Sequence, residues 1–321
     1  MTQDIIIVTG GAGFIGSRFI KYVFDNTESD IVCVDKMTYA ANRNRIDDYI
    51  WKDDRFSFIQ KDICDLELKD LPKDFTHIVN FAAESHVDNS IKDGSPFLKS
   101  NIEGVYNLLQ VVLKRGLEGF ERFVQISTDE VYGDMKTVKK YGASEDHILK
   151  PSSFYSSTKA SAEMLVMSAY KTYGVPYLIT RSCNNFGPNQ HEEKFLPTLF
   201  KSVYEGKKVP VYGDGQQVRE WMHVDDNVRI IHALMNSNGS EDIVNIGSNF
   251  RYTNMEIVEM VADALGKKVK VKHVKDRQGH DKVYHLDCDY LEERIGEYLF
   301  LCIEGFFKDE VRRIDCIIDG R

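Results

Sequence analysis

The sequence predicts an α/β fold, in which a doubly wound parallel sheet is followed by a smaller C-terminal α/β domain. Apolar runs of strand length alternate with segments of helical length through residue 181. This rhythm is typical of βαβ units, whose strands pair in one parallel sheet. The runs of strand length are residues 5–8, 31–34, 56–59, 77–81, 123–126 and 177–180.

Two of the intervening segments are the clearest helices. Residues 97–114 repeat apolar side chains near i, i+3 and i+4 spacing, and residues 154–173 are rich in Ala and Met. Both segments also carry apolar residues on an outer face. We therefore expect that they can form a contact between subunits.

The pattern changes after Arg181, where glycines and prolines interrupt it at 187–188, 197, 210 and 213–215. Further helices are expected over about residues 195–204, 225–236 and 254–265, separated by short strands. We predict one domain over residues 1–181 and a second over residues 182–321, with some chain crossing back to the sheet. A cleft between two packed domains is a natural place for a ligand.

The composition excludes several classes of function. The 321 residues carry a net charge of -9 and no dense Lys/Arg cluster, which argues against a nucleic-acid partner. The N-terminus has no basic leader and no apolar stretch could span a bilayer, so we expect no membrane partner and a cytoplasmic protein. The six cysteines include no Cys-x-x-Cys pair, and neither a metal site nor a disulfide framework is predicted.

A glycine-rich segment, Gly-Gly-Ala-Gly-Phe-Ile-Gly at 10–16, follows the first predicted strand and opens a helix. Such glycines allow the backbone to approach a pyrophosphate, and the helix N-terminus offers N–H groups to the anion. Asp35 ends the next strand, where its carboxylate would bind a ribose 2'-hydroxyl and repel a 2'-phosphate. The segment predicts a Rossmann-type site that favours NAD over NADP, but Lys36 beside Asp35 weakens the exclusion of NADP.

Tyr155 and Lys159 lie four residues apart in the second helix, so their side chains share one face, roughly 6 Å apart along the axis. We expect the ammonium and the cationic ring of the cofactor to lower the pKa of the phenol. The phenolate could then take a proton from an alcohol as hydride leaves the same carbon. The preceding strand ends in Ser127 and Thr128, which offer a hydroxyl to hold that alcohol.

Two adjacent carboxyls, Asp129 and Glu130, follow directly after that strand. Elimination of water needs a protonated carboxyl that delivers a proton to the leaving oxygen, and an ionised one that removes a carbon-bound proton. Repulsion between neighbouring like charges helps to separate two such pKa values. Oxidation or epimerisation alone needs no such pair, so the pair favours a dehydratase.

Together these motifs resemble the extended short-chain dehydrogenase/reductase family, and within it the dTDP-glucose 4,6-dehydratases. The resemblance runs from about residue 5 to about residue 290 and includes the segments 80–88, 180–188, 193–197, 212–224, 245–247 and 276–281. It implies a hydro-lyase of deoxysugar biosynthesis that acts as a homodimer. The first domain would bind NAD and carry the catalytic residues, and the second would mainly bind the nucleotide sugar.

The resemblance implies a role for each catalytic residue. Tyr155 would accept the C4 hydroxyl proton, with Lys159 beside it and Thr128 bonded to O4, while C4 hydride passes to NAD. Glu130 would then remove the C5 proton, and Asp129 would protonate the departing C6 hydroxyl. Hydride returns to C6 and Glu130 reprotonates C5, so that NAD is regenerated in each cycle and stays tightly bound.

The resemblance also implies two sets of binding residues. The nucleotide sugar would meet Ser85, Asp88, Thr128, Asn184, Lys194, Phe195, Pro210, Tyr212, Arg219, Asn254, Arg277 and His280, whose cations would hold the pyrophosphate. NAD would meet Gly10, Gly13, Phe14, Ile15, Gly16, Asp35, Lys36, Thr38, Asp62, Ile63, Phe81, Ala82, Ala83, Ser85, Ser100, Tyr155, Lys159 and Asn185.

Some residues depart from the family pattern. Asn89 stands where the family usually has Arg, and Ala41 replaces a usual Gly. UDP-glucose or another nucleotide hexose therefore stays open as the substrate. A nucleotide-sugar 4-epimerase and a non-enzymatic regulator that binds NAD or a sugar nucleotide are the further alternatives. After Leu291 the sequence diverges and ends early, and no role is assigned to that end.

Overall fold

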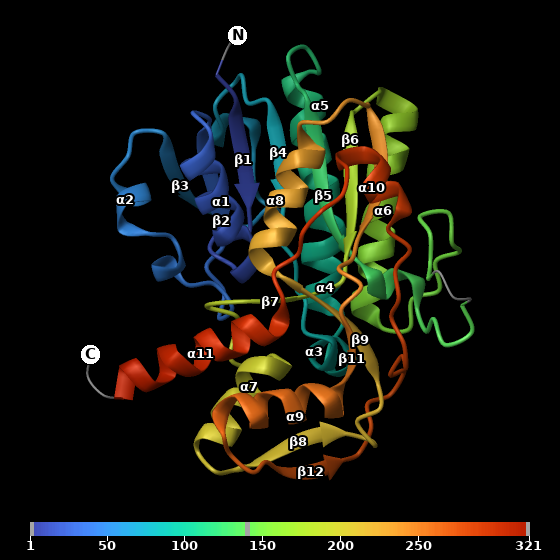
Figure 1. Ribbon diagram of the computed structural model, residues 1–321. Helices are drawn as coiled ribbons and strands as arrows, with labels where there is room; N and C mark the ends of the chain where they lie inside the picture. Colours follow the sequence, from blue (N-terminus) through green and yellow to red (C-terminus); the bar gives the residue numbers. More distant parts are fainter. Residues whose placement is uncertain (1–2, 139–141, 319–321) are drawn as a thin grey trace.

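The computed structural model describes the backbone of residues 3–138 and 142–318, with side chains up to Val311. A seven-stranded sheet forms the centre of this part of the chain, and all its neighbouring strands pair in parallel (Figure 1). In spatial order its strands are β10 (Glu241–Ile246), β6 (Tyr177–Ser182), β5 (Arg122–Thr128), β4 (His77–Asn80), β1 (Ile5–Thr9), β2 (Asp30–Asp35) and β3 (Phe56–Gln60).

Side chains of the sheet alternate between two apolar cores, because successive residues of a strand point to opposite faces. On β1, Ile6 and Val8 enter the core that α1 (Phe14–Asn26) and α8 (Val224–Met235) cover. Ile7 enters the other core, which α5 (Gly104–Arg115) and α6 (Phe154–Tyr173) cover. The strand order reverses between β1 and β4, and this confirms the predicted Rossmann-type doubly wound sheet.

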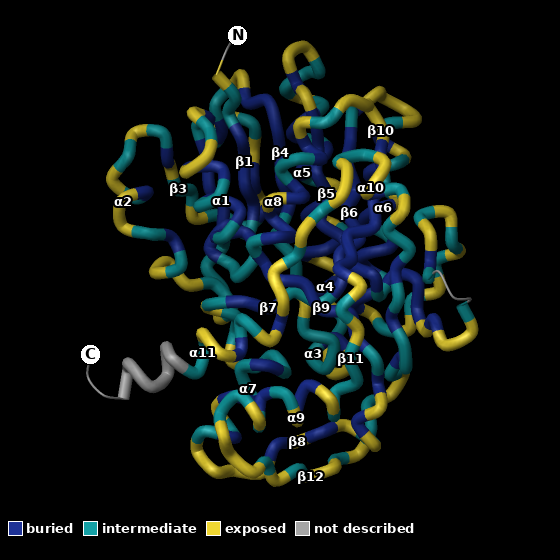
Figure 2. The backbone as a smooth tube through the Cα atoms, viewed as in Figure 1, coloured by how far each residue is buried: buried dark blue, intermediate teal, exposed yellow. Residues whose placement is uncertain are grey.

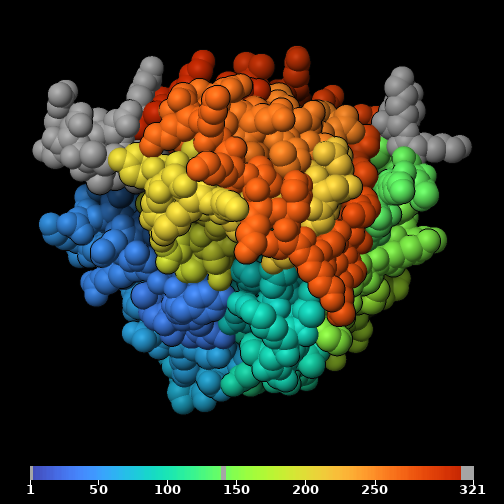
Figure 3. Space-filling view, turned by 90° about the horizontal axis from the view of Figure 1, so that it is seen from below, coloured from blue at the N-terminus to red at the C-terminus, as the bar shows by residue number. Residues whose placement is uncertain are grey.

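A smaller part of the chain lies beyond the carboxyl ends of these strands. It contains a sheet of β11 (Arg251–Thr253), β9 (Val218–His223) and β7 (Asn184–Phe186), and a pair of β12 (Lys270–Val274) and β8 (Lys208–Tyr212). The helices α7 (Phe195–Tyr204) and α9 (Asn254–Leu265) pack with these strands around a third core. Figure 3 shows these yellow and orange atoms lying against the blue and teal atoms of the first half.

The C-terminal half of the chain also contributes to the main sheet. β10 extends that sheet beside β6, and α8 packs against α1 on one of its faces. A single boundary at residue 181 would therefore separate β10 and α8 from the main sheet to which they belong. The predicted division into two domains stays a prediction.

The helix predicted over residues 97–114 is not a single α-helix. It consists of α4 (Ser95–Leu98), a π-helical turn η3 (Lys99–Glu103) and α5. The π turn buries Ser100 and Asn101, and the Asn101 side chain bonds both the N–H and the carbonyl of Glu84 beyond β4. Apolar spacing near i, i+3 and i+4 predicts a helix but does not distinguish a single π turn within it from a regular α-helical turn.

The C-terminal end adds two helices, α10 (Asp289–Ile295) and α11 (Ile303–Ile318). Ile303 and Phe307 are buried in the third core, and α11 packs on α9. Figure 2 shows the first turns of α11 against the smaller part of the molecule, while Figure 1 shows the helix running outward from it. Ile295, Tyr298 and Phe300 pack instead against the core of the main sheet. The divergent end thus contributes to the packing of both parts of the chain.

No helix within the described ranges is long and apolar enough to cross a membrane. The same ranges contain no group of three or more His, Cys, Asp and Glu side chains that could hold a metal ion. The cysteines with described side chains are all unpaired, and of these only Cys33 and Cys183 are buried.

Gly133 and Gly174 allow a test of backbone strain near β5. Gly133 has φ 71° and ψ -158°, and a Cβ there would lie 2.0 Å from the Lys150 carbonyl oxygen. Gly174 caps α6 in the left-handed region, and its Cβ would meet nothing closer than 3.9 Å. We predict that Gly133→Ala lowers the free energy of unfolding by roughly 3 kcal/mol or more and Gly174→Ala by about 1 kcal/mol, measured by urea unfolding. Equal losses would contradict this account.

Candidate active site

The glycine-rich segment forms a tight turn between β1 and α1. Gly10 has φ 68°, and a Cβ there would lie 2.6 Å from the backbone nitrogen of Ala82, which follows β4. A Cβ on Gly16 would lie 2.4 Å from the Gly10 carbonyl oxygen. Gly13 caps the N-terminus of α1 without a side chain. The first turn of α1 therefore has N–H groups that a pyrophosphate can use.

Asp35 at the end of β2 is tied to this turn. Its Oδ2 accepts the N–H of Ala12 at 3.0 Å, and its Oδ1 accepts the N–H of Met37 at 2.8 Å. Burial raises the pKa of the Asp35 carboxyl, while these two bonds and nearby cations oppose the rise. The carboxyl thus fixes the loop after β2 against the glycine turn, at the place where a ribose hydroxyl is expected.

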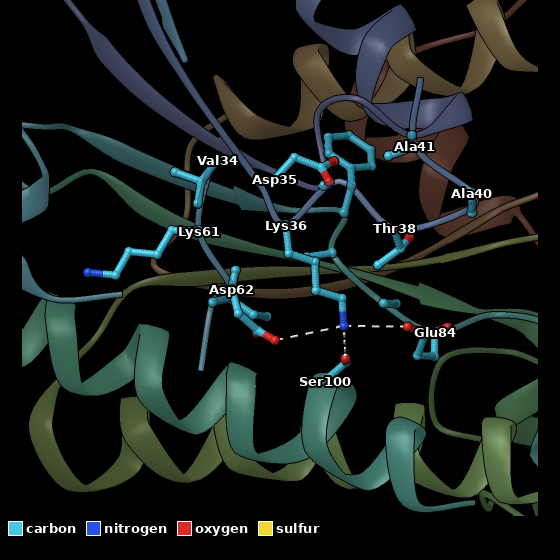
Figure 4. A pocket seen from close by; sticks show the side chains of 16 residues that line it. Val34, Asp35, Lys36, Thr38, Ala40, Ala41, Lys61, Asp62, Glu84 and Ser100 are labelled. Carbon is cyan, nitrogen blue, oxygen red and sulfur yellow. Dashed lines mark hydrogen bonds and ion pairs between the residues drawn. The ribbon is translucent and has the colours of Figure 1, made fainter. Parts of the chain in front are cut away.

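A hollow opens beside the glycine turn (Figure 4). Many predicted cofactor residues line it, namely Gly10, Gly13, Asp35, Lys36, Thr38, Asp62, Ile63, Phe81, Ala82, Ala83 and Ser100. Its lining also includes residues that the sequence reasoning did not assign to the cofactor: Val34, Ala40, Ala41, Lys61 and Glu84. All five residues lie at or just beyond the carboxyl end of a strand, so their position after the predicted strands could have identified them as part of the cofactor site. The glycine turn, the helix N-terminus and Asp35 fit a dinucleotide.

The other predicted cofactor residues lie outside this lining. Phe14, Ile15 and Gly16 are in the first turn of α1, and Ser85 is exposed beyond β4. Tyr155 and Lys159 are on α6 and Asn185 is on β7. The Asn185 amide donates to the Cys183 carbonyl, and its buried Oδ1 has no hydrogen-bond partner among the described residues. That oxygen is a free acceptor for a bound group.

Lys36 does not point toward Asp35. Its Nζ donates to Ser100 Oγ at 2.9 Å and lies 3.4 Å from a Glu84 carboxyl oxygen and 3.9 Å from one of Asp62, as Figure 4 shows. Two carboxylates therefore surround this ammonium, which makes it a weaker partner for a 2'-phosphate than the sequence alone suggested.

The catalytic candidates meet where β5 ends. Thr128 is the last residue of β5, and a short 3-10 helix, η4 (Asp129–Tyr132), follows it. The Thr128 hydroxyl accepts the N–H of Glu130 at 3.3 Å and donates to Asp129 Oδ1 at 3.2 Å. Asp129 is 1% exposed, and its Oδ2 lacks a hydrogen-bond partner among the residues that the structure describes. This geometry favours the protonated form of Asp129.

The two carboxyls have different electrostatic surroundings. Burial, followed by the charge of Glu130, raises the pKa of Asp129 well above its usual range. Burial also raises the pKa of Glu130, but Arg277, Arg219 and Lys194 all oppose that rise. Asp129 is thus suited to give a proton and Glu130 to take one.

Tyr155 and Lys159 lie in the first turns of α6, and both are buried. Burial, then the charges of Glu130 and Asp129, raises the pKa of Tyr155. Burial lowers the pKa of Lys159 to about 8, and its ammonium donates to the Ile126 carbonyl. In the chain by itself, burial and the two carboxyls therefore raise the phenol pKa, and among the described residues only a hydrogen bond with Thr128 opposes the rise. The expected effect of Lys159 together with the cationic ring of the cofactor stays a prediction.

Several predicted substrate residues gather opposite Glu130. The Tyr212 hydroxyl donates to Asp88 at 2.8 Å, and Arg277 lies 3.9 Å from the same carboxyl group. Lys194 donates to the Ser85 carbonyl at 3.4 Å, and burial lowers its pKa. The ring of His280 is 6.1 Å from that of Tyr212. Lys194, Arg277 and Arg219, from three segments of the chain, all act on the charge of Glu130. Such a group of cations suits binding of a diphosphate by an acidic protein.

The remaining substrate candidates lie around this group. Arg219 is buried, donates to the Asp281 carbonyl at 2.9 Å and stacks 4.2 Å over the Tyr284 ring. Phe195 begins α7 and Asn254 begins α9, where its N–H donates to the Gln217 carbonyl. Asn184 begins β7, and Pro210 is an exposed residue of β8. The predicted set therefore spans both small sheets rather than forming one compact patch.

Comparison with known proteins agrees with this geometry. The chain matches the NAD dependent epimerase/dehydratase family over residues 6–247. It is 43% identical over 284 residues to the low-salt glycan biosynthesis protein Agl12 of Haloferax volcanii, which covers 88% of this chain and 89% of that protein. It is 38% identical over 315 residues to dTDP-glucose 4,6-dehydratase of Haemophilus influenzae, with 91% and 92% covered.

Solved structures give the same assignment. DesIV, a dTDP-glucose 4,6-dehydratase from Streptomyces venezuelae crystallised with NAD, aligns with a TM-score of 0.91 and 36% identity over 98% of both chains. A UDP-glucuronic acid 4-epimerase from Bacillus cereus, in complex with UDP-glucuronic acid and NAD, aligns with a TM-score of 0.88 and 26% identity over 97% of this chain and 99% of that one. This protein therefore belongs to the NAD-dependent epimerase/dehydratase family and is similar to its dTDP-glucose 4,6-dehydratases.

Proposed function

We propose that the protein is an NAD-dependent lyase that converts dTDP-glucose to dTDP-4-keto-6-deoxyglucose. The observation that carries this proposal is the pair of adjacent carboxyls at the end of β5. Burial and the charge of Glu130 favour protonated Asp129, whereas three cations favour ionised Glu130. A 4-epimerase needs no such pair, but an elimination needs both members.

The first step would be oxidation at C4 of the sugar. Tyr155 takes the proton of the C4 hydroxyl while Thr128 holds O4. Bound NAD supplies a hydride acceptor at C4 and a hydride donor at C6. The buried Tyr155 needs help to ionise, and Lys159 on the same face of α6 is the nearest ammonium on that helix. A ketone at C4 then makes the C5 proton acidic.

The second step would be loss of water across C5 and C6. Glu130 removes the C5 proton, and Asp129 gives its proton to the leaving C6 oxygen. Glu130 later returns a proton to C5 as C6 is reduced. Arg277 and Lys194, which face Glu130, would hold the diphosphate and keep this carboxyl ionised until it is needed.

The two parts of the chain would divide the work. We propose that residues 1–181 hold NAD and the catalytic groups, and that residues 182–321 mainly bind the nucleotide sugar. The hollow beside the glycine turn would take the adenosine half of NAD, with Asp62 and Ile63 near the adenine. Regeneration in each cycle would let NAD stay bound between turnovers.

Other substrates within the family keep their place as alternatives. UDP-glucose or another nucleotide hexose could undergo the same elimination. Epimerisation at C4 is the second alternative, because the structure is similar to a UDP-glucuronic acid 4-epimerase. A regulator that binds NAD or a sugar nucleotide without turnover is the third alternative.

Incubation of the protein with a panel of nucleotide hexoses distinguishes these alternatives. A 4-keto product made fastest from dTDP-glucose supports the proposal, whereas a C4 epimer or no turnover rejects it.

Replacement of Glu130 tests the base. We predict that Glu130→Gln slows formation of the 4-keto-6-deoxy product by roughly 100-fold or more, because the C5 proton loses its acceptor. Oxidation at C4 should persist, so reduced cofactor should accumulate, which is measured by its absorbance in the near ultraviolet. The control is Glu121→Gln, an exposed carboxyl just before the other end of β5, which should behave as the wild type. Wild-type elimination by the Glu130 variant would reject this role.

The acid can be tested through pH. Because the pKa of Asp129 is raised, this carboxyl stays protonated below that raised value and loses its proton as pH increases through it. We predict that elimination falls on the alkaline side, and that Asp129→Asn lowers its rate and removes this decline. C4 oxidation, measured separately, should keep its own pH dependence. An unchanged alkaline decline in the Asp129→Asn variant would count against the assignment.

We also propose a homodimer through α4, η3, α5 and α6. Leu98, Tyr106, Phe154, Met164 and Tyr173 are all more than half exposed on these elements, which pack against one another. We predict a dimer by analytical ultracentrifugation and a shift to monomer for the double variant Tyr106→Lys with Met164→Lys. Ile148→Lys, which is exposed outside these helices, is the control. A monomeric wild-type chain would end this proposal.

A further inference from the structure

A buried ion pair lies behind the catalytic turn, and the proposed mechanism does not use it. Arg181 NH2 on β6 is 2.7 Å from Glu163 Oε2 on α6, with the two side chains 3% and 0% exposed. The Arg181 Nε also lies 3.2 Å from both carboxylate oxygens. Desolvating two charges costs about as much as their attraction returns, so such a pair is weak evidence for stability alone.

The partners of this pair point to a different role. The Ser127 hydroxyl donates to Glu163 Oε1, and Arg181 NH1 donates to the Tyr132 hydroxyl at 2.7 Å. Ser127 directly precedes Thr128, and Tyr132 is the last residue of η4. The ion pair therefore holds the chain on both sides of the segment 128–130, through Ser127 before it and Tyr132 after it.

The same pair is also joined to the helix that carries Tyr155 and Lys159. Glu163 stands four residues beyond Lys159 on α6, so the two side chains lie on the same face, one turn apart. The Lys159 ammonium donates to the Ile126 carbonyl on β5. Two links, from Lys159 to Ile126 and from Glu163 to Ser127, thus set the position of α6 against the end of β5.

The far side of the network is anchored as well. The Tyr132 hydroxyl donates to Asn245 Oδ1 on β10 at 2.8 Å, and Arg181 NH1 also donates to the Glu145 carbonyl at 2.8 Å. The Asn245 N–H in turn donates to Glu145 Oε1 at 2.8 Å. A buried network whose members all have partners is rigid and allows few alternative arrangements.

From these contacts we infer that Glu163 and Arg181 are positioning residues that fix the turn carrying Asp129 and Glu130 against the helix carrying Tyr155. Ser127 and Tyr132 are the two points through which the pair acts. The inference rests on the proposed dehydration, because oxidation needs Tyr155 and Thr128, whereas elimination also needs both carboxyls of the turn. Loosening the network should therefore slow elimination more than oxidation.

The test uses variants that remove one hydroxyl and leave the packing in place. Ser127→Ala and Tyr132→Phe are compared with Tyr290→Phe, which removes a hydroxyl bonded to Asp242 at 2.8 Å on β10. With dTDP-glucose, we expect elimination by Ser127→Ala and Tyr132→Phe to fall roughly tenfold, with KM changed less than about twofold. Reduced cofactor should accumulate, which a general loss of folded protein would not produce. The thermal midpoint of each variant is measured in parallel, without substrate.

The outcomes separate the two proposals. A wild-type protein that forms no 4-keto product overturns the proposed function itself. A wild-type protein that dehydrates dTDP-glucose, together with Ser127 and Tyr132 variants that match Tyr290→Phe, overturns only the positioning role. Oxidation and elimination slowed to the same extent, with no reduced cofactor, would also overturn it, because that result indicates a structural effect alone.

Discussion

The arrangement of the site depends on one constraint: the strands of the main sheet are parallel, so their carboxyl ends meet at one edge. The glycine turn after β1, Asp35 on β2, Asp62 after β3, Ala82 after β4 and Thr128 on β5 are far apart in sequence but share this edge. The reversal of strand order between β1 and β4 leaves room there for the cofactor. Gly10 can lie this close to Ala82 because glycine has no Cβ and readily adopts a positive φ.

Charge is the second determinant of the site. Because the protein has a net charge of -9, it needs a local group of cations to bind an anion such as NAD. The smaller part of the chain brings Lys194, Arg219 and Arg277 toward Glu130, and all three oppose the rise in its pKa. For the buried Asp129, Arg219 opposes the rise, whereas the charge of Glu130 adds to it. Two neighbouring carboxyls therefore have different proton affinities, although their side chains leave adjacent residues of one short helix. The difference comes from tertiary structure, through burial and through segments more than sixty residues away.

Much of this could be predicted from the sequence. The six strands through residue 182 were predicted within two residues of their observed ends, and local patterns predicted the glycine turn and placed the catalytic candidates Tyr155 and Lys159 on the helix α6. Local patterns missed the π turn of η3, the engagement of Lys36 with Asp62 and Glu84, and the raised pKa of Tyr155. Each of these depends on contacts between elements that are distant in sequence.

The central claim is that Glu130 exchanges the C5 proton during an elimination. The most direct measurement is conversion of dTDP-glucose in heavy water, with the product examined by NMR. The account predicts a 4-keto-6-deoxy product that carries solvent deuterium at C5, because the proton that Glu130 removes can exchange before it returns. A product without deuterium at C5, or a C4 epimer of the starting sugar, would contradict the account.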